Sequence, residues 1–161
     1  MRAARAILFG VMGAGAISVV SALLRAVGIG MNMELILGTL LGGAPSAMTF
    51  TLGLVIHLAV GGLFGLGYAY LFERVWNHGG ASTGMLIATI HAALIGMFIG
   101  LTPQFHPHVP EHIVDPGPFF ANAGLAGVVA FFAIHLMYGA IVGAGYGHVE
   151  AEREWAPAGR L

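Results

Sequence analysis

The stretch AMTFTLGLVIHLAVGGLFGLGYAYLF, residues 47–72, decides the fold, because it carries no charged side chain from end to end. About 20 consecutive apolar residues are enough for a helix to cross the hydrocarbon of a bilayer, and this stretch is longer. A single imidazole, His57, lies near its middle. The stretch therefore predicts a membrane-spanning helix with one polar ring buried at depth.

Three further stretches have the same character, and together they predict spans at about 6–27, 47–72, 82–101 and 121–147. The composition agrees, since 58% of the residues are hydrophobic and 8% are charged, whereas soluble domains carry about 25% charged residues. We expect Ser46 and Ser82 to cap two of the helices. The predicted fold class is an all-α integral membrane protein with four transmembrane helices, and residues 1–161 form a single transmembrane domain.

A shorter apolar segment, MNMELILGTLLGG at 31–43, lies between the first two spans. Its apolar run, 35–41, is too short to cross a bilayer. We therefore expect a short interfacial or re-entrant helix here. Glu34 stands at its edge, where we expect it to neutralise Arg25 rather than to serve the loop that follows the third span.

The arginines predict the orientation of the spans. Four spans place only Arg25 on one side of the membrane and the other arginines on the opposite side, which the positive-inside rule makes cytoplasmic. We expect a protein integral to a bacterial cytoplasmic (inner) membrane, with both termini cytoplasmic and the loop 102–120 outside. The residues expected on the cytoplasmic side are Arg2, Arg5, Arg74, Arg153 and Arg160, with Trp76 and Trp155 at the interface.

The first span also resembles a secretory signal peptide, because MRAARAILFGVMGAGAISVV has a basic start followed by an apolar core. We interpret it as an uncleaved span, since the apolar run is long and Arg25 closes it. Cleavage would leave three spans and would place the mature N-terminus outside.

Composition also excludes several classes of function. The chain has no lysine and a net charge of −1, so it offers no basic patch to nucleic acid. It has no cysteine, which excludes disulfides, thiolate metal sites and cysteine nucleophiles. GASTG at 80–84 matches a hydrolase pattern, but that pattern requires a strand before the serine. With no nucleophile beside a base, we favour a protein that is not an enzyme.

Three histidines, His57, His91 and His135, lie inside three different spans. Counted from the expected outer ends at about 1.5 Å per residue, they lie about 15, 15 and 21 Å deep, near the middle of the bilayer. Ionisable side chains at this depth are costly and mark functional sites by default. Gly53 and Gly61, one turn on either side of His57, leave a groove beside its ring.

These histidines allow three functional interpretations and one structural one. Convergent imidazoles would bind a transition metal ion such as copper, zinc or iron. Two of them would alternatively ligate a haem b, or the set would carry protons or hold a quinone beside Tyr138 or Tyr68. Structurally, each ring would only bond a backbone carbonyl or Thr89. The candidate cofactor-binding residues are His57, His91, His135 and Tyr138, and the three histidines are also candidate metal ligands.

The densest polar stretch is TPQFHPHVPEHIVDPGP, residues 102–118. We expect Pro107 and Pro110 to hold it extended, with His106 and His108 on the same side and His112 brought round by a turn. Such a set suits copper(II), zinc or nickel and would deliver the ion to the spans; the alternative is a solvated loop. The candidate metal ligands are His106, His108, His112, Glu111 and Asp115.

Small-xxx-small glycine pairs occur in three spans, and such pairs allow membrane helices to pack closely. We expect these pairs to pack helices within the bundle, in a homo-oligomer or in a larger membrane complex. The expected partners are thus the lipid bilayer and membrane proteins, with no nucleic acid. The pairs are Gly61 with Gly65, Gly96 with Gly100, and Gly139 with Gly143.

The closing pattern HLMYGAIVGAGYG, residues 135–147, resembles the last span of small uncharacterised four-helix bacterial inner-membrane proteins. The resemblance implies only the fold and the location. From the residues, we expect a membrane protein that binds a transition metal or haem b through its intramembrane histidines, in metal handling or electron transfer. The alternatives are a non-catalytic accessory subunit of a membrane complex and a small proton-coupled carrier.

Overall fold

The computed structural model describes residues 1–147, and in this range the chain is helical and has no strand. Four helices are long and apolar enough to cross a membrane. A π-helical turn, η1 (Leu71–Val75), prolongs α3, and two 3-10 segments, η2 (Thr102–Gln104) and η3 (Pro118–Ala123), lie between α4 and α5. The α-helices are α1 (Ala3–Ala26), α2 (Met33–Thr39), α3 (Ala47–Tyr70), α4 (Ala81–Ile99) and α5 (Gly124–Tyr146).

The long helices coincide with the predicted spans to within a few residues, and one of the two predicted caps is confirmed. The Ser46 hydroxyl accepts a hydrogen bond from the Thr49 amide at 3.2 Å, and the Thr49 hydroxyl accepts one from the Ser46 amide at 2.9 Å, a reciprocal capping box. The cap predicted at Ser82 is wrong. Gly80 takes that position with a φ of 110°, which glycine adopts without strain, so Ser82 lies inside the first turn of α4.

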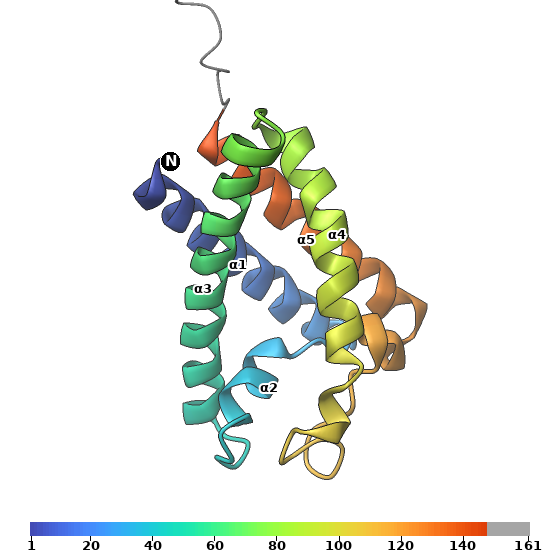
Figure 1. Ribbon diagram of the computed structural model, residues 1–161. Coiled ribbons are helices and arrows are strands. Elements are labelled where there is room, and N and C mark those ends of the chain that lie inside the picture. The colour runs from blue at the N-terminus through green and yellow to red at the C-terminus, as the bar shows by residue number, and fades with distance from the viewer. Residues whose placement is uncertain (148–161) are drawn as a thin grey trace, which may run out of the picture.

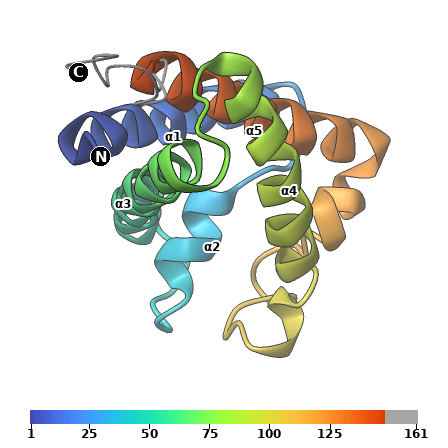
Figure 2. The same ribbon diagram turned by 45° about the horizontal axis from the view of Figure 1, so that its top comes forward.

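The helices form two pairs. α1 packs along α3, α4 packs along α5, and contact between α1 and α5 joins the pairs. α3 and α4 stand apart in both ribbon views (Figures 1 and 2), although they are consecutive spans. We call the surface between α3 and α4 the open flank.

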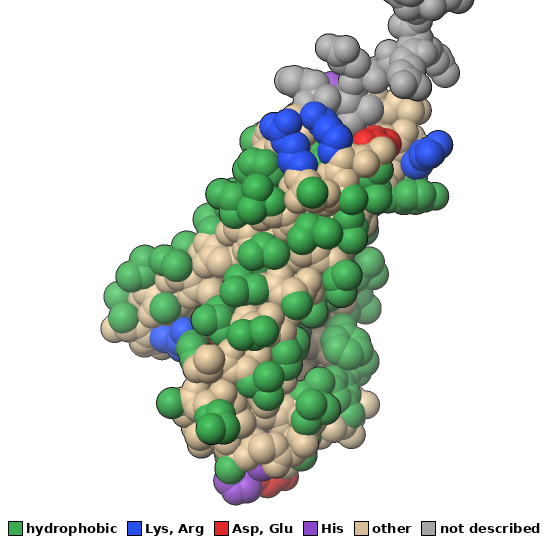
Figure 3. Space-filling view, turned by 90° about the vertical axis from the view of Figure 1, so that its left-hand side faces the viewer, with side chains coloured by type: hydrophobic (Ala, Val, Ile, Leu, Met, Phe, Trp, Pro, Cys, Tyr) green, Lys and Arg blue, Asp and Glu red, His purple; other side chains and the backbone are tan. Residues whose placement is uncertain are grey.

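The two ends of the molecule differ in charge (Figure 3). At one end α1 begins and α3 and α5 finish, since Met1 N lies 3.0 Å from Glu73 and the Arg5 side chain donates to the Gly145 carbonyl at 2.6 Å. We call this the arginine end and the opposite one, with residues 100–123, the loop end. Arg25 belongs to the loop end. Of the residues expected at the cytoplasmic side, Arg153, Arg160 and Trp155 lie outside the described range.

Glycines bring the paired helices into backbone contact. A Cβ added to Gly61 would overlap Ala14, and one added to Gly84 would overlap the carbonyl oxygen of Gly139. The other predicted pairing residues are also covered within the chain: Gly65 by Ala6, Gly143 by Gly80, and Gly96 and Gly100 by Phe119 and Pro118. These glycine faces thus pack the bundle itself, and a second copy or a partner would need a different surface.

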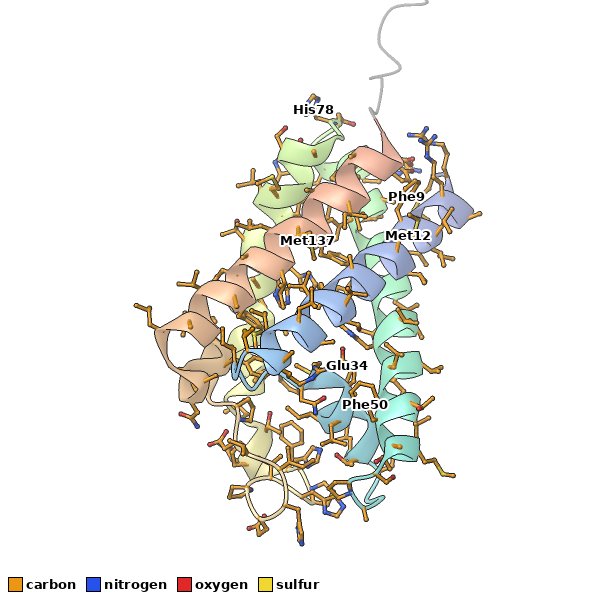
Figure 4. The ribbon with its side chains drawn as sticks, turned by 180° about the vertical axis from the view of Figure 1, so that it is seen from behind. Phe9, Met12, Glu34, Phe50, His78 and Met137 are labelled. Carbon is orange, nitrogen blue, oxygen red and sulfur yellow. The ribbon has the colours of Figure 1, made fainter. Side chains whose placement is uncertain are left out.

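The short helix α2 lies within the segment 31–43 and packs on α3 through Gly38 and Gly53, at each of which a Cβ would overlap the facing backbone. It carries Glu34, whose side chain is 1% exposed and is directed toward α1 (Figure 4). The Arg25 guanidinium donates to the Glu34 carboxylate at 3.2 Å, so the predicted pairing of these two residues is confirmed.

The extended conformation predicted around Pro107 and Pro110 is wrong, but the predicted turn that brings His112 toward His108 is present. The His106 amide donates to the Thr102 carbonyl at 2.9 Å, and the His112 amide donates to the His108 carbonyl at 2.9 Å. The loop is therefore a series of turns that folds back on the loop end. The fixed φ of proline suits turns as well as extended chain, so Pro107 and Pro110 did not distinguish the two conformations.

Candidate functional site

A cavity of about 280 Å³ lies inside the bundle, between all five α-helices. Its walls are mostly apolar, and the imidazoles of His57, His91 and His135 line it from α3, α4 and α5. The structure therefore brings the three predicted residues to one space. The same cavity reaches the loop end, where Thr102 and His106 line it.

His91 and His135 form the closest pair. Their ring centroids lie 5.4 Å apart, and the rings are nearly perpendicular at 83°. His135 donates from Nδ1 to the Phe131 carbonyl at 2.7 Å, and since a carbonyl only accepts, this bond places a proton on Nδ1. In the neutral ring, Nε2 then carries a free lone pair. The Nδ1 atom of His91 forms a hydrogen bond with the Tyr68 hydroxyl at 3.2 Å.

His57 belongs to a polar group that reaches the loop end. Its Nδ1 atom lies 3.1 Å from the Ser18 hydroxyl, to which it is hydrogen-bonded, and 3.9 Å from Oε1 of Glu34. Glu34 pairs with Arg25 through Oε2, while Oε1 is buried and has no hydrogen-bond partner in residues 1–147. Burying a charged oxygen in this way is costly unless another group compensates it.

One feature is common to the three rings. Each uses Nδ1 to bond a protein group, and the Nε2 atoms make no hydrogen bond within residues 1–147. Metal-binding histidines are held in this manner, because a bond at one nitrogen fixes the tautomer and the ring orientation while the other nitrogen ligates. The cavity thus contains oriented imidazoles with unused nitrogen atoms.

The two tyrosines beside the cavity have different roles. The Tyr138 hydroxyl donates to the Gly61 carbonyl at 2.6 Å, which ties α5 to α3. Tyr138 was predicted to bind a cofactor, but its hydroxyl is already occupied, although the residue lines the cavity. Tyr68 is the residue that holds His91, and its ring lies 5.5 Å from the ring of Tyr138.

Metal and haem fit this arrangement unequally. Within residues 1–147, no three or more His, Asp or Glu side chains are grouped so that they would hold a metal ion together. A metal site would therefore rest on the His91–His135 pair with other donors. A haem needs its two axial rings on opposite faces of a flat macrocycle. His91 and His135 instead meet edge to face on α4 and α5, whose backbones touch at Gly84 and Gly139.

In the loop 102–120, His106 is buried, and its ring holds the loop against α2. Its Nε2–H donates to the Ile36 carbonyl at 2.9 Å, and its Nδ1 accepts from the His108 amide at 3.1 Å. Both ring nitrogens are therefore used to fix the loop against α2. As placed here, His106 lines the cavity without a nitrogen available for an ion.

The other predicted loop ligands differ in their surroundings. His108 donates from Nε2 to the Gly42 carbonyl at 3.2 Å, its buried Nδ1 has no partner in residues 1–147, and the ring of His112 lies 5.4 Å away. The Asp115 carboxylate instead accepts from the Gly117 amide at 2.8 Å and shapes the turn before η3. Glu111 is exposed. The structure thus brings the rings of His106, His108 and His112 into a row, with centroids 6.3 and 5.4 Å apart, and leaves Glu111 and Asp115 outside it.

Sequence reasoning missed two contacts of the site. Ser18 was not considered, although a hydroxyl in the middle of an apolar span is a signal of the same kind as the histidines. Glu34 was expected only to neutralise Arg25, and its approach to His57 depends on how α2 folds against α3. Thr89, considered as a histidine partner, donates to the Met85 carbonyl at 3.1 Å instead.

Comparison with known proteins adds no relative: no protein-family model, curated protein or solved structure matches the chain.

Proposed function

We propose that the protein is a membrane-spanning metal-handling protein that binds a copper(I) ion through Nε2 of His91 and His135. The observation that carries the proposal is the pair of adjacent imidazoles, 5.4 Å apart, whose Nδ1 atoms are bonded to Tyr68 and to the Phe131 carbonyl. Such bonds orient metal-binding imidazoles. His57 lines the same cavity and is a third nitrogen along the path of the ion.

Copper(I) suits this site better than the other metals expected from the sequence. Structural zinc requires four ligands and catalytic zinc at least three, and the described residues offer a pair. Soft thioether and imidazole donors favour copper(I), and the sulfur-bearing residues Met31 and Met33 line the same cavity as the histidines. The proposed orientation places the arginine end in the cytoplasm, so that copper would arrive from the outside through the loop end.

The test is copper binding by the purified protein under reducing conditions, measured by elemental analysis and by competition with a copper(I)-specific chelator. We expect about one copper per chain, and zinc should not replace it. Changing His91→Gln or His135→Gln should weaken binding by at least about tenfold, the effect that even an outer-sphere change has on metal sites. His78→Gln, at the arginine end (Figure 4), is the matched control and should bind as the parent does.

Tyr68→Phe separates ligation from orientation. It keeps both imidazoles but removes the hydroxyl from His91, so copper binding should weaken by about tenfold without being lost. If the double variant His91→Gln/His135→Gln folds normally and still binds copper as the parent does, the proposal is overturned. A protein that binds neither copper nor haem would leave the accessory-subunit interpretation.

A further inference from the structure

A second cavity, of about 450 Å³, opens on the arginine half of the open flank. It shares Phe64, His91 and Ile95 with the histidine cavity but extends in the other direction along α3 and α4. Apart from the His91 ring and tyrosine hydroxyls, its walls are hydrocarbon and aromatic. We call it the flank groove; its further lining residues are Gly67, Tyr68, Tyr70, Leu71, Trp76, Ile87, Ile90 and Leu94.

The groove is formed by the backbone of α3 as well as by its side chains. Gly67 lines it and is exposed, and a Cβ added there would meet no atom within 4 Å. The groove is therefore open space beside a helix that is apolar enough to cross a membrane. In a bilayer its surroundings are acyl chains, so an occupant of this part must be hydrocarbon.

The arginine end of the groove has a different character. Tyr70 and Trp76 line it there, and both residue types favour the membrane–water interface. Arg74 is exposed and lies in the π-helical turn η1, two residues before Trp76. Its neighbour Glu73 is already bonded to Tyr146 and lies 3.0 Å from Met1 N. Arg74 interacts electrostatically with Glu73 but forms no ion pair within 4 Å in residues 1–147.

We propose that the flank groove is a binding site for an anionic glycerophospholipid, with one acyl chain along Gly67 and the phosphate beside Arg74. A hydrocarbon slot that ends at aromatic interface residues and an exposed arginine matches the order of groups in such a lipid. Arginines near a membrane surface favour anionic lipids. The inference requires that the helices span a bilayer, but it does not rest on copper binding.

The experiment uses Trp76 as the reporter, because it lines the groove and is 39% exposed. The chain has two tryptophans, Trp76 and Trp155, so Trp155→Phe leaves a single fluorophore. This protein is reconstituted in phosphatidylcholine vesicles that contain small fractions of brominated phosphatidylglycerol or brominated phosphatidylcholine, whose bromines quench tryptophan on contact. Brominated phosphatidylglycerol should reach half-maximal quenching at a mole fraction about fivefold lower than brominated phosphatidylcholine does.

Two substitutions with matched controls localise the effect. Arg74→Gln should abolish the preference for the anionic lipid, and Arg74→Lys should keep it. Gly67→Leu should reduce quenching by both lipids because the side chain fills the slot, whereas Gly67→Ala should not. The open space around Gly67 allows both variants to fold.

Equal quenching by the two lipids, or full quenching in Gly67→Leu, would overturn the proposal. Quenching by neither lipid would also overturn it, since the groove would then be covered by protein, such as a second copy of this chain. Copper binding measured on the Arg74 variants should match that of the parent, because Arg74 lines neither cavity, so failure of this proposal is separable from failure of the proposed function.

Discussion

At the scale of single residues, Glu34 shows how the site is connected to the loop end. Its two carboxylate oxygens have different surroundings, one paired with Arg25 and the other left 3.9 Å from the His57 ring. Removing one partner of a buried ion pair costs more than replacing both by apolar groups, because the remaining charge loses its compensation. The carboxylate thus compensates the charge of a guanidinium whose other contacts are the Met31 carbonyl, at 2.6 Å, and the face of the Phe50 ring.

We expect Glu34→Leu to lower the free energy of unfolding by about 1–3 kcal/mol, because the Arg25 guanidinium loses its partner. Adding Arg25→Leu should recover part of this loss, since the apolar pair requires no compensation. Unfolding in detergent mixtures with increasing sodium dodecyl sulfate measures the free energy of unfolding of the single and of the double variant. A double variant that is no more stable than Glu34→Leu would show that the pair does not act as a unit.

For single residues, the sequence predicted that the histidines lie together but not which groups their rings bond. Counting residues along an apolar span gives the depth of a histidine, and His57, His91 and His135 do share one cavity. The partners of each ring depend on the rotation of each helix about its axis. The spans are apolar on all sides, so periodicity contains no signal for that rotation. The bonds to Ser18 and Tyr68 were therefore not predictable.

At the scale of elements, glycine determines which helices pair. The close contact of Gly84 with Gly139 replaces side-chain packing by backbone packing between α4 and α5. Membrane helices gain little from the hydrophobic effect against one another, so close packing is a main source of their association. The glycine pairs were recognisable in the sequence, but which helix faces which was not, because the motif is the same in several spans.

Gly84→Ala should destabilise the protein by about 1–3 kcal/mol, the usual range for overpacking a tight contact. Gly67→Ala, where the added methyl meets open space, should be neutral or stabilising by up to about 1 kcal/mol, because alanine is the better helix former. Thermal unfolding in detergent compares the two directly. Equal destabilisation would contradict the α4–α5 contact described above.

At the scale of the whole molecule, the spans alternate in direction, and the chain passes from the arginine end to the loop end and back. The number and order of the spans followed from composition and length, because stretches of about 20 apolar residues have few alternatives. Of the turns in the loop 102–120, the sequence predicted only the one that brings His112 round, since the prolines and histidines of the loop are compatible with several backbone conformations. The open flank between α3 and α4 could not be predicted from the sequence either, because consecutive helices usually lie side by side.

The absence of native cysteine makes the orientation directly measurable. In intact cells of a bacterial host, a membrane-impermeant maleimide should label Glu111→Cys at the loop end. Ser82→Cys at the arginine end should be labelled only after the membrane is opened, as the positive-inside rule requires. Labelling with the opposite pattern would invert the topology and the proposed direction of copper delivery.

The open flank also means that the imidazoles are not enclosed by polypeptide alone. On the side where α3 and α4 separate, Phe64 and Tyr68 of α3 reach the His91 ring, and the flank groove opens beside them to whatever surrounds the protein. The dielectric surroundings of His91 are thus partly a property of the solvent phase. The copper affinity that we propose for this site should accordingly differ between micelles and bilayers of different thickness.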